Sequence, residues 1–320
     1  MIRIATRRSP LARWQANHVA DLLRAREPSA DVRLHELVTR GDKILDVALA
    51  RVGGKGLFVK EIEDALLAGE AEIAVHSMKD LPAVLAEGLV VGAVPVREDP
   101  RDALCSPRYG SLGKLPRAAR VGTSSLRRAA QLKALRPDLA IEMVRGNVET
   151  RLRKASEGLD AVVLAYAGLR RLGLAQHATQ VFDPSEMLPA VAQGALALEA
   201  RASDAATLAR LAPLDDPETR QRVEAERGLL RRLEGGCQVP IAAHATLAEG
   251  RLTLRALVAS LDGARIVRGE RSARARPASA GEALEDARAI GEALGEELLA
   301  AGAAEILEEL EAEAPDVRET

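Results

Sequence analysis

Short apolar runs alternate with segments of helical periodicity from the N-terminus to residue 211. Strands that alternate with helices in this way indicate parallel, doubly wound sheets, so the pattern predicts an α/β fold. The predicted strands cover residues 3–6, 32–38, 73–76, 89–94, 120–123, 140–144 and 161–165. The predicted helices cover residues 11–25, 58–68, 124–135, 148–157 and 205–211.

The pattern changes after residue 215. A charged helix is predicted over 218–233, and three alternating segments, 241–247, 251–258 and 265–271, follow it with short turns between them. Alternation with a period of two and short connections is typical of an antiparallel sheet. Helices over 283–300 and 303–310 come next, so we expect a smaller α+β domain at the C-terminal end.

Two charged, proline-containing segments interrupt the α/β pattern, at residues 97–102 and 183–194. A chain of 320 residues is expected to form two or three domains. Two crossings predict a discontinuous first lobe that is joined to a second lobe by a hinge. The predicted domains are 1–95 plus 196–214, 96–195 and 215–310, followed by an acidic tail, 311–320. The polar, glycine-rich stretch 39–56 predicts a long mobile loop of the kind that covers functional clefts.

Composition and charge narrow the classes of function. Hydrophobic residues make up 47% and charged residues 29%, as in globular proteins. A net charge of −2 argues against a general nucleic-acid binder. No apolar run has the length of a membrane span, and the charged N-terminus lacks the apolar core of an export signal. Cys105 and Cys237 lie far apart without zinc-type spacing, so we expect no metal site and a reducing cytoplasm.

Cys237 follows two glycines and precedes Pro240, so its loop turns sharply and can approach a large group closely. A thiol presented in this way is a candidate nucleophile or covalent attachment point. The alternative is a small apolar side chain buried at a turn. A cysteine hydrolase would also need a histidine base, for which His244 is the candidate.

Basic and hydroxyl side chains follow four of the predicted strands. Ligands of open α/β sheets bind beyond the carboxyl ends of strands, and a helix that starts there favours anions. Arginine binds carboxylates through a bidentate fork, so the set predicts a cleft for a small molecule with several separated carboxylates. The residues of this set are Arg7, Ser9, Lys79, Ser125, Arg127, Arg128, Arg145 and Arg151.

Asp80 is an acid among these bases. One interpretation is a salt bridge to Lys79 or to a nearby arginine. The other is that its carboxylate stabilises a cation formed during a reaction, or moves a proton. At about 4 Å such a pair attracts by roughly 4 kcal/mol at an effective dielectric constant of ~20, which is about a thousandfold in rate. A hinged two-lobe binding protein for a polycarboxylate also fits the cleft, but it needs neither Asp80 nor Cys237.

Ten segments, in order along nearly the whole chain, resemble the porphobilinogen deaminase (hydroxymethylbilane synthase) family. The segments are RIATRRSPLA at 3–12, VTRGDKILD at 38–46, VGGKGLFVKEIE at 52–63, AVHSMKDLP at 74–82, REDPRDAL at 97–104, VGTSSLRR at 121–128, RGNVETRL at 145–152, LAYAGLRRLGL at 164–174, LPAVAQGALALEAR at 188–201 and LEGGCQVPIAAHA at 233–245.

The resemblance implies two periplasmic-binding-protein-like (type II) lobes and an enzyme that joins four porphobilinogen molecules head to tail into hydroxymethylbilane with release of ammonia, in tetrapyrrole biosynthesis. It implies a dipyrromethane cofactor, made from the substrate and held by a thioether to Cys237. It further implies a cytoplasmic monomer that binds neither nucleic acid nor membrane and hands its product to uroporphyrinogen-III synthase.

The resemblance also assigns roles to residues. Asp80 is the implied catalytic residue, which stabilises the pyrrole nitrogens and the cation left when ammonia departs. The implied cofactor-binding residues are Cys237, Lys79, Asp80, Ser125, Arg127 and Arg128. The implied substrate-binding residues are Arg7, Ser9, Lys55, Phe58, Arg145, Arg151, Arg171 and Gln193, with Lys55 closing over the cleft and Phe58 packing on a pyrrole.

Three positions depart from the family's pattern, namely Arg8, Arg51 and Tyr166. Arg51 keeps a positive charge where lysine is expected, whereas Tyr166 replaces a small residue and is expected to narrow the cleft slightly. Cys105 has no implied role, and we expect a buried or idle thiol.

Overall fold

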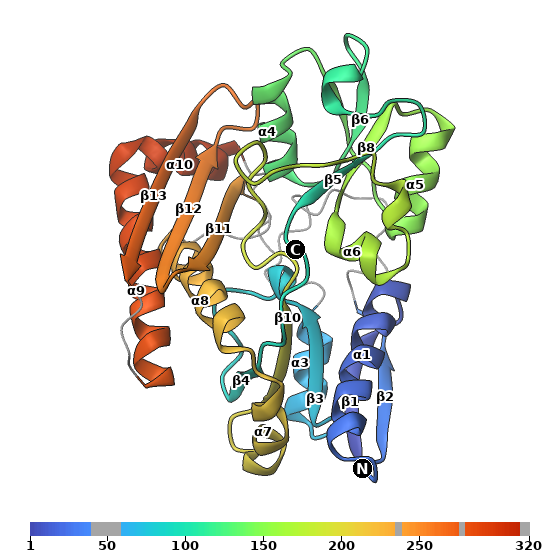
Figure 1. Cartoon of the computed structure of the whole chain (residues 1–320), viewed down its shortest axis with the longest axis vertical. Coiled ribbons are helices and arrows are strands. Elements are labelled where there is room, and N and C mark those ends of the chain that lie inside the picture. Colours follow the sequence, from blue (N-terminus) through green and yellow to red (C-terminus); the bar gives the residue numbers. More distant parts are fainter. Residues whose placement is uncertain (40–58, 234–238, 275–278, 314–320) are drawn as a thin grey trace.

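The computed structural model describes residues 1–39, 59–233, 239–274 and 279–313 of the chain. The strands of these residues form two five-stranded sheets and one three-stranded sheet. One five-stranded sheet lies at the lower end of Figure 1 and the other at the upper end, with the three-stranded sheet at the left. The fold is therefore α/β, with two similar lobes and a smaller C-terminal domain. In the described part of the chain, no helix is both long and apolar enough to cross a lipid bilayer.

The first lobe is built on a sheet with strand order β2-β1-β3-β10-β4. Alternate residues of its strands are buried on opposite faces: Ile4 packs in the same cluster as Val19 of one helix, and Ala5 packs with Leu66 of another. Burial on both faces is what a doubly wound sheet requires. The elements are β1 (Ile2–Arg7), α1 (Pro10–Arg26), β2 (Val32–Leu37), α3 (Lys60–Leu67), β3 (Ile73–Ser77), the 3-10 turn η2 (Met78–Asp80), β4 (Leu89–Ala93), β10 (Leu196–Arg201), α7 (Ala205–Leu211) and η5 (Ala212–Leu214).

The second lobe repeats this arrangement in the order β7-β6-β8-β5-β9. Val121 and Val162, on neighbouring strands, belong to clusters on opposite faces of the sheet. The elements are β5 (Asp102–Cys105), η3 (Leu112–Lys114), β6 (Arg120–Gly122), α4 (Leu126–Leu135), β7 (Ala140–Glu142), α5 (Val148–Glu157), β8 (Ala161–Ala165), α6 (Tyr166–Arg171), η4 (Ala175–His177) and β9 (Gln180–Val181).

The two sheets are mixed, whereas the alternating pattern predicted parallel ones. β10 runs antiparallel to β3 and β4, and β5 runs antiparallel to β8 and β9. Each of these strands begins where the chain enters a lobe from the crossing segments, next to the carboxyl ends of the parallel strands. A strand that enters from that edge must run in the opposite direction, which explains the reversal.

The predicted strands and helices are present with slightly shifted ends, but the pattern missed β5, β9, β10 and α6. β5 begins with Asp102, and β10 contains Glu199; both carboxylates are fully buried. A charged residue inside a short strand makes it look like a polar connection, because buried acids are rare unless they are paired. Here both are paired, as described below.

The C-terminal domain packs two helices against one face of the sheet β11-β12-β13. α8 and α9 cross closely, since a Cβ atom at Gly291 would lie 2.0 Å from the carbonyl oxygen of Ala225. The other face of the sheet packs through Ala242 and Leu257 against Ala130 and Leu188 of the second lobe. The elements are α8 (Pro217–Arg232), β11 (Ile241–Ala248), β12 (Arg251–Ala259), β13 (Ile266–Arg274), α9 (Ala280–Leu298), a π-helical turn (Leu299–Ala303) and α10 (Ala304–Glu313).

A buried ion pair joins the crossing segments to this domain. Arg97 donates from Nη1 and Nη2 to the two carboxylate oxygens of Glu226 on α8, at 2.7 and 3.0 Å. The side chains are 3% and 0% exposed. The same carboxylate accepts from the backbone N–H of Ala192 at 2.6 Å and of Ala245 at 2.8 Å. One carboxylate therefore fixes both crossing segments to the C-terminal domain.

Removal of Arg97 is expected to destabilise the fold strongly, because Glu226 would remain buried without its cation. We expect Arg97→Leu to lower the free energy of unfolding by about 3–5 kcal/mol, measured by urea denaturation. The matched control is Arg255→Leu, whose ion pair with Glu270 is 56% and 50% exposed, so its loss should cost only about 0–1 kcal/mol. Equal losses in the two variants would contradict the role given to Glu226.

Candidate active site

The side chains that follow the parallel strands lie at the edges where the two lobes face each other. In the first lobe, β3 leads directly into η2, which carries Lys79 and Asp80. In the second lobe, Ser125 caps α4 by accepting from the backbone N–H of Arg128 at 3.4 Å. Arg127 and Arg128 occupy the first turn of α4. Both strand ends therefore present cations at the start of a helical turn.

Gln193, on the crossing segment between the lobes, connects these two groups. Its Oε1 accepts from Lys79 Nζ of the first lobe and from Arg128 Nη2 of the second, each at 3.4 Å. Its Nε2 donates to the Pro100 carbonyl at 2.7 Å and to Asp102 Oδ1 at 2.9 Å. The amide thus holds one cation of each lobe at the hinge.

Asp102 is a residue of this group that the sequence pattern missed. Its carboxylate is fully buried and pairs with Arg127 Nη1 at 2.7 Å and Arg128 Nη2 at 2.8 Å. Burial acts to raise its pKa, but Arg127 and Arg128 together hold the pKa of Asp102 well below its usual value. Arg127 Nη1 also donates to the Leu188 carbonyl at 2.7 Å and the residue is 4% exposed, so both donors of this nitrogen are used inside the protein. Arg128 is the one that reaches Gln193.

Arg151 of α5 joins the same group of charges. Burial, followed by the neighbouring charge of Arg128, lowers its pKa to about 10, and Asp80 and Arg145 act on it more weakly in opposite directions. The Nε of Arg145 is buried and has no hydrogen-bond partner among the described residues. Lys79 of the first lobe and Arg151 of the second therefore both feel the charge of one acid, Asp80, which is itself exposed.

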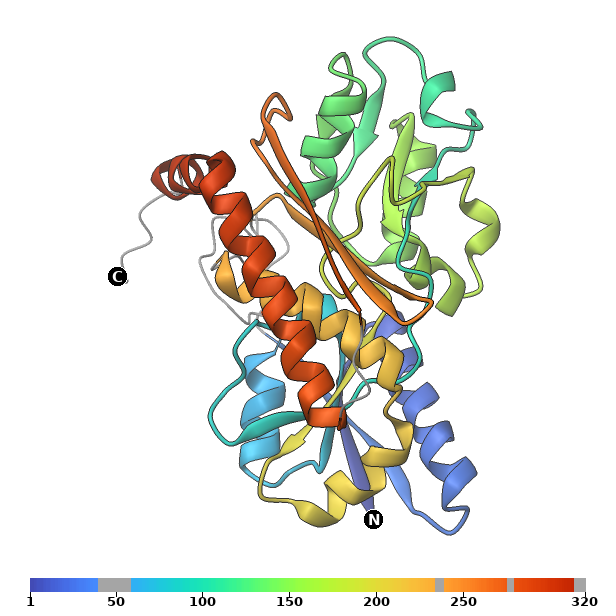
Figure 2. The ribbon, with the colours of Figure 1, turned by 60° about the vertical axis from the view of Figure 1, so that its left-hand side comes forward.

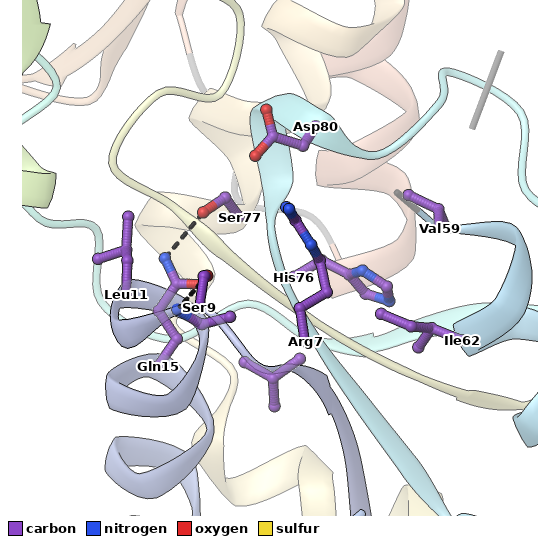
Figure 3. A pocket seen from close by; sticks show the side chains of 11 residues that line it. Arg7, Ser9, Leu11, Gln15, Val59, Ile62, His76, Ser77 and Asp80 are labelled. Atoms are coloured by element: carbon purple, nitrogen blue, oxygen red, sulfur yellow. Dashed lines mark hydrogen bonds between the residues drawn. The ribbon is translucent and has the colours of Figure 1, made fainter. Parts of the chain in front are cut away.

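A cavity beside Asp80 extends this group into the first lobe (Figure 3). Arg7 extends toward Asp80 in this view, and Ser9 accepts from the backbone N–H of Ala12 at 3.3 Å as the cap of α1. Gln15, which the sequence pattern did not single out, donates from Nε2 to Ser77 Oγ at 2.7 Å. The lining residues are Arg7, Ser9, Leu11, Ala12, Gln15, Val59, Ile62, Val75, His76, Ser77 and Asp80.

His76, one of the lining residues, is paired with a buried acid behind it in the sheet. Its Nε2 lies 3.0 Å from Glu199 Oε2 on the neighbouring strand β10, and the side chains are 4% and 0% exposed. His76 thus supplies a partner for one oxygen of a buried carboxylate in the middle of the sheet, which is a structural role.

Arg171 lies apart from this group, at the contact between the lobes. It is 8% exposed, donates from Nη2 to the Gly194 carbonyl at 2.7 Å, and lies over the ring of Trp14. The side-chain contacts described for Arg171 are with the hinge and with the first lobe.

Cys237, Lys55 and Phe58 lie outside the described residues, as does all but Thr39 of the predicted loop 39–56. The helix α8, which precedes residues 234–238 in the chain, nevertheless contacts the segment that follows Asp80. Arg227 of α8 donates to the carbonyls of Leu81 at 3.3 Å and Pro82 at 2.7 Å, directly after Asp80. The helix that precedes the cysteine loop is thereby fixed to the segment that carries the acid.

The remaining sequence expectations concern two residues. Cys105 is buried on β5, and burial raises the pKa of its thiol to about 12, as expected for an idle thiol. Tyr166 is half-buried at the start of α6, and its backbone N–H donates to the Arg101 carbonyl at 3.0 Å.

The donor set fits a ligand with several carboxylates. Lys79, Arg128, Arg145 and Arg151 lie near one another with Asp80 as the acid among them, and the Nε atom of Arg145 is buried without a hydrogen-bond partner in the described chain. Buried donors without acceptors are costly, so they favour a ligand that supplies acceptors. No cluster of three or more His, Cys, Asp or Glu side chains suited to a metal ion occurs among the described residues.

Comparisons with known proteins agree with this chemistry. The family model described as porphobilinogen deaminase, dipyromethane cofactor binding domain, matches residues 2–209, and the model of the porphobilinogen deaminase C-terminal domain matches residues 220–300. The porphobilinogen deaminase of Syntrophobacter fumaroxidans is 54% identical over 311 residues, covering 97% of this chain and 98% of that protein. That of Nitratidesulfovibrio vulgaris is 54% identical over 309 residues, or 96% of each chain.

Among solved structures, a periplasmic substrate-binding protein of an ABC transporter from Coxiella burnetii matches 67% of this chain and 91% of its own with a TM-score of 0.44 and 13% identity, too low to carry an argument. The family models and the relatives, by contrast, cover nearly the whole chain, including both lobes and the C-terminal domain. The chain belongs to the porphobilinogen deaminase family.

Proposed function

We infer that this chain is a porphobilinogen deaminase, an enzyme of tetrapyrrole biosynthesis that forms hydroxymethylbilane from porphobilinogen. Family membership over nearly the whole chain supports this activity. The observation that supports the site is the meeting of Lys79 and Arg128, from different lobes, at the amide of Gln193. The finer statement, that four substrate molecules are joined head to tail with loss of ammonia, is part of this proposal.

The substrate explains why the cleft is basic. Each porphobilinogen carries an acetate and a propionate, so a growing chain accumulates carboxylates. We propose that Arg7, Ser9, Arg145 and Arg151 bind these groups, while Lys55 and Phe58 close over them and Gln193 orients the cations at the hinge. A charge-assisted hydrogen bond contributes about 1.5–3 kcal/mol, so a few such bonds suffice to hold an intermediate.

We propose that Cys237 holds the dipyrromethane cofactor through a thioether. The donors described above fit such a group: Lys79, Ser125 and Arg128 would bind its carboxylates, whereas Arg127 contributes chiefly by fixing Asp102. The hydrogen bonds from Arg227 to Leu81 and Pro82 support this proposal, because they fix α8, the helix before Cys237, beside the segment that follows Asp80. When bound, the cofactor supplies the pyrrole ring to which the first substrate is joined.

Asp80 is the proposed catalytic residue. Departure of ammonia from porphobilinogen leaves a cation on the substrate, and the Asp80 carboxylate lies where cations outnumber anions. An anion placed there stabilises the developing charge more than the neutral ground state, which is the condition for faster reaction.

Three further proposals rest on the family resemblance alone. The protein acts in the cytoplasm, it acts as a monomer, and it passes its product to uroporphyrinogen-III synthase.

The mass of the purified protein tests the cofactor proposal. We expect intact-mass spectrometry to give the mass of the chain plus two linked pyrroles, because the cofactor is covalent. Cys237→Ala should lack this increment, whereas Cys105→Ala should retain it as the matched control. Fully active protein with the unmodified mass would refute the proposal.

Asp80→Asn tests the electrostatic role. The amide keeps the shape of the side chain but removes the charge, so turnover should fall by about a thousandfold while the fold and much of the substrate binding persist. Steady-state kinetics and thermal unfolding measure the two effects separately. Turnover near that of the wild type would remove Asp80 from the chemistry.

The pKa of Lys79 tests its place in the ligand site. Burial lowers this pKa from the usual 10.5 to about 8. The unfolded chain therefore binds more protons than the folded one between these values, so the penalty for burying the charged ammonium is full below about pH 8 and disappears as pH rises to about 10.5.

In cofactor-free protein carrying Cys237→Ala, Lys79→Met should accordingly raise the free energy of unfolding by about 1–3 kcal/mol at pH 7. The gain should shrink toward zero near pH 10. In the cofactor-loaded protein the sign should reverse, because bound carboxylates stabilise the ammonium. Urea denaturation measures each case, and a pH-independent effect of the same sign in both forms would contradict the assignment.

A further inference from the structure

Trp14 and Arg171 bring together two helices of different lobes. α6 lies directly against the end of α1 in Figure 1, and the same two helices meet at the right of Figure 2. The guanidinium carbon of Arg171 lies 5.8 Å from the centroid of the Trp14 ring. His18, on the next turn of α1, stacks on this ring with the centroids 5.0 Å apart and the planes inclined by 13°. The indole is therefore held between the two lobes.

Arg171 also contacts the hinge. Its Nη2 donates to the Gly194 carbonyl at 2.7 Å, and the same carbonyl accepts from the backbone N–H of Glu98 at 3.2 Å on the other crossing segment. The adjacent Arg170 forms an ion pair with Glu98 at 2.9 Å. Gly194 has φ +90°, and a Cβ atom there would lie 2.3 Å from the Glu98 carbonyl oxygen. One helix thus touches both crossing segments and the facing lobe.

The positively charged guanidinium of Arg171 makes both of these contacts, with the Gly194 carbonyl and with the Trp14 ring. Burial lowers its pKa to about 10, so it stays charged at neutral pH. A cation over an indole face is attracted to the ring, and the attraction is weak enough to be broken and remade during turnover. The contact between Arg171 and Trp14 is therefore reversible, and it does not join the two lobes permanently.

We infer that Trp14 and Arg171 form an interlobe latch that sets how closely the two lobes approach each other as the product chain grows. Arg171 is then a positioning residue that couples the hinge to α1, rather than a group that binds substrate carboxylates. The lobes need to separate to admit each added pyrrole, and this clause alone rests on the proposed function. Loss of the latch should shift the ratio of open to closed molecules by about two- to five-fold.

The fluorescence of Trp14 tests the latch directly, because the chain contains one tryptophan. In cofactor-loaded protein without substrate, Arg171→Leu should raise the rate constant of acrylamide quenching up to about five-fold, since the indole loses its cover. Arg171→Lys keeps a cation and should lie near the wild type. Arg170→Leu, which removes the neighbouring ion pair but not the ring contact, is the matched control and should match the wild type.

Substitutions of Trp14 test the consequence for turnover. Trp14→Leu should change the distribution of enzyme-bound intermediates, or the rate of product release, by about two- to five-fold. The KM for porphobilinogen should stay close to that of the wild type. Trp14→Phe keeps an aromatic face and should restore the wild-type distribution, which a merely space-filling role would not require.

Two results would overturn the latch. One is equal acrylamide quenching in Arg171→Leu and the wild type. The other is a raised KM in Arg171→Leu while Trp14→Leu keeps the wild-type intermediates, which would return Arg171 to substrate binding. The quenching measurement needs no turnover, so it distinguishes a failed latch from a failed proposal of function.

Discussion

The buried carboxylate of Asp102 organises the cleft. Two guanidinium groups and one amide converge on it, so Arg127, Arg128 and Gln193 have few alternative positions. A buried carboxylate without such neighbours would be very costly, and the pairing therefore constrains the carboxylate and the cations together. Because Gln193 also contacts Lys79, the constraint passes from the second lobe to the first. The positive lining of the site is in place before any ligand arrives.

This arrangement suits a reaction that repeats on a growing anion. Cations held by the protein's own carboxylate and amide need little reorganisation when a ligand binds, which is the source of most electrostatic catalysis. Asp80, by contrast, is exposed and has cations around it. Asp80, the acid proposed to stabilise positive charge, and Asp102, the acid that orders the arginines, thus differ in burial.

Three domains meet at the hinge, and separate interactions fix each of them. Arg97 and Glu226 connect the crossing segments to the C-terminal domain. Arg227 connects the helix before the cysteine loop to the segment after Asp80. Arg171 connects α6 to the crossing segment and to α1, through a contact weak enough to open. The contacts of Arg97 and Arg227 fix the segments around the site, whereas the weaker contact of Arg171 with Trp14 lies where the two lobes face each other.

The sequence by itself determined the α/β class, the position of most strands and helices, the antiparallel C-terminal sheet and the family. These follow from local periodicity and from contiguous motifs, which need no knowledge of distant contacts. It also singled out Lys79, Asp80, Ser125 and Arg128 as candidates, because each lies within five residues of the end of a recognisable strand. It could not find Asp102, Glu199 or Gln15, since a buried acid in a short strand and a glutamine inside a helix look like ordinary polar positions until their partners are known.

Tertiary structure alone decided what the arginines do. Arg127, Arg128 and Arg171 look equivalent in a sequence, but their contacts differ. Arg127 pairs with Asp102, Arg128 also donates to Gln193, and Arg171 lies over the indole of Trp14. It also decided the direction of β5 and β10, because that depends on the edge at which the chain enters each lobe. A guanidinium carries the same charge everywhere, and its role depends on which acceptors the fold brings within reach.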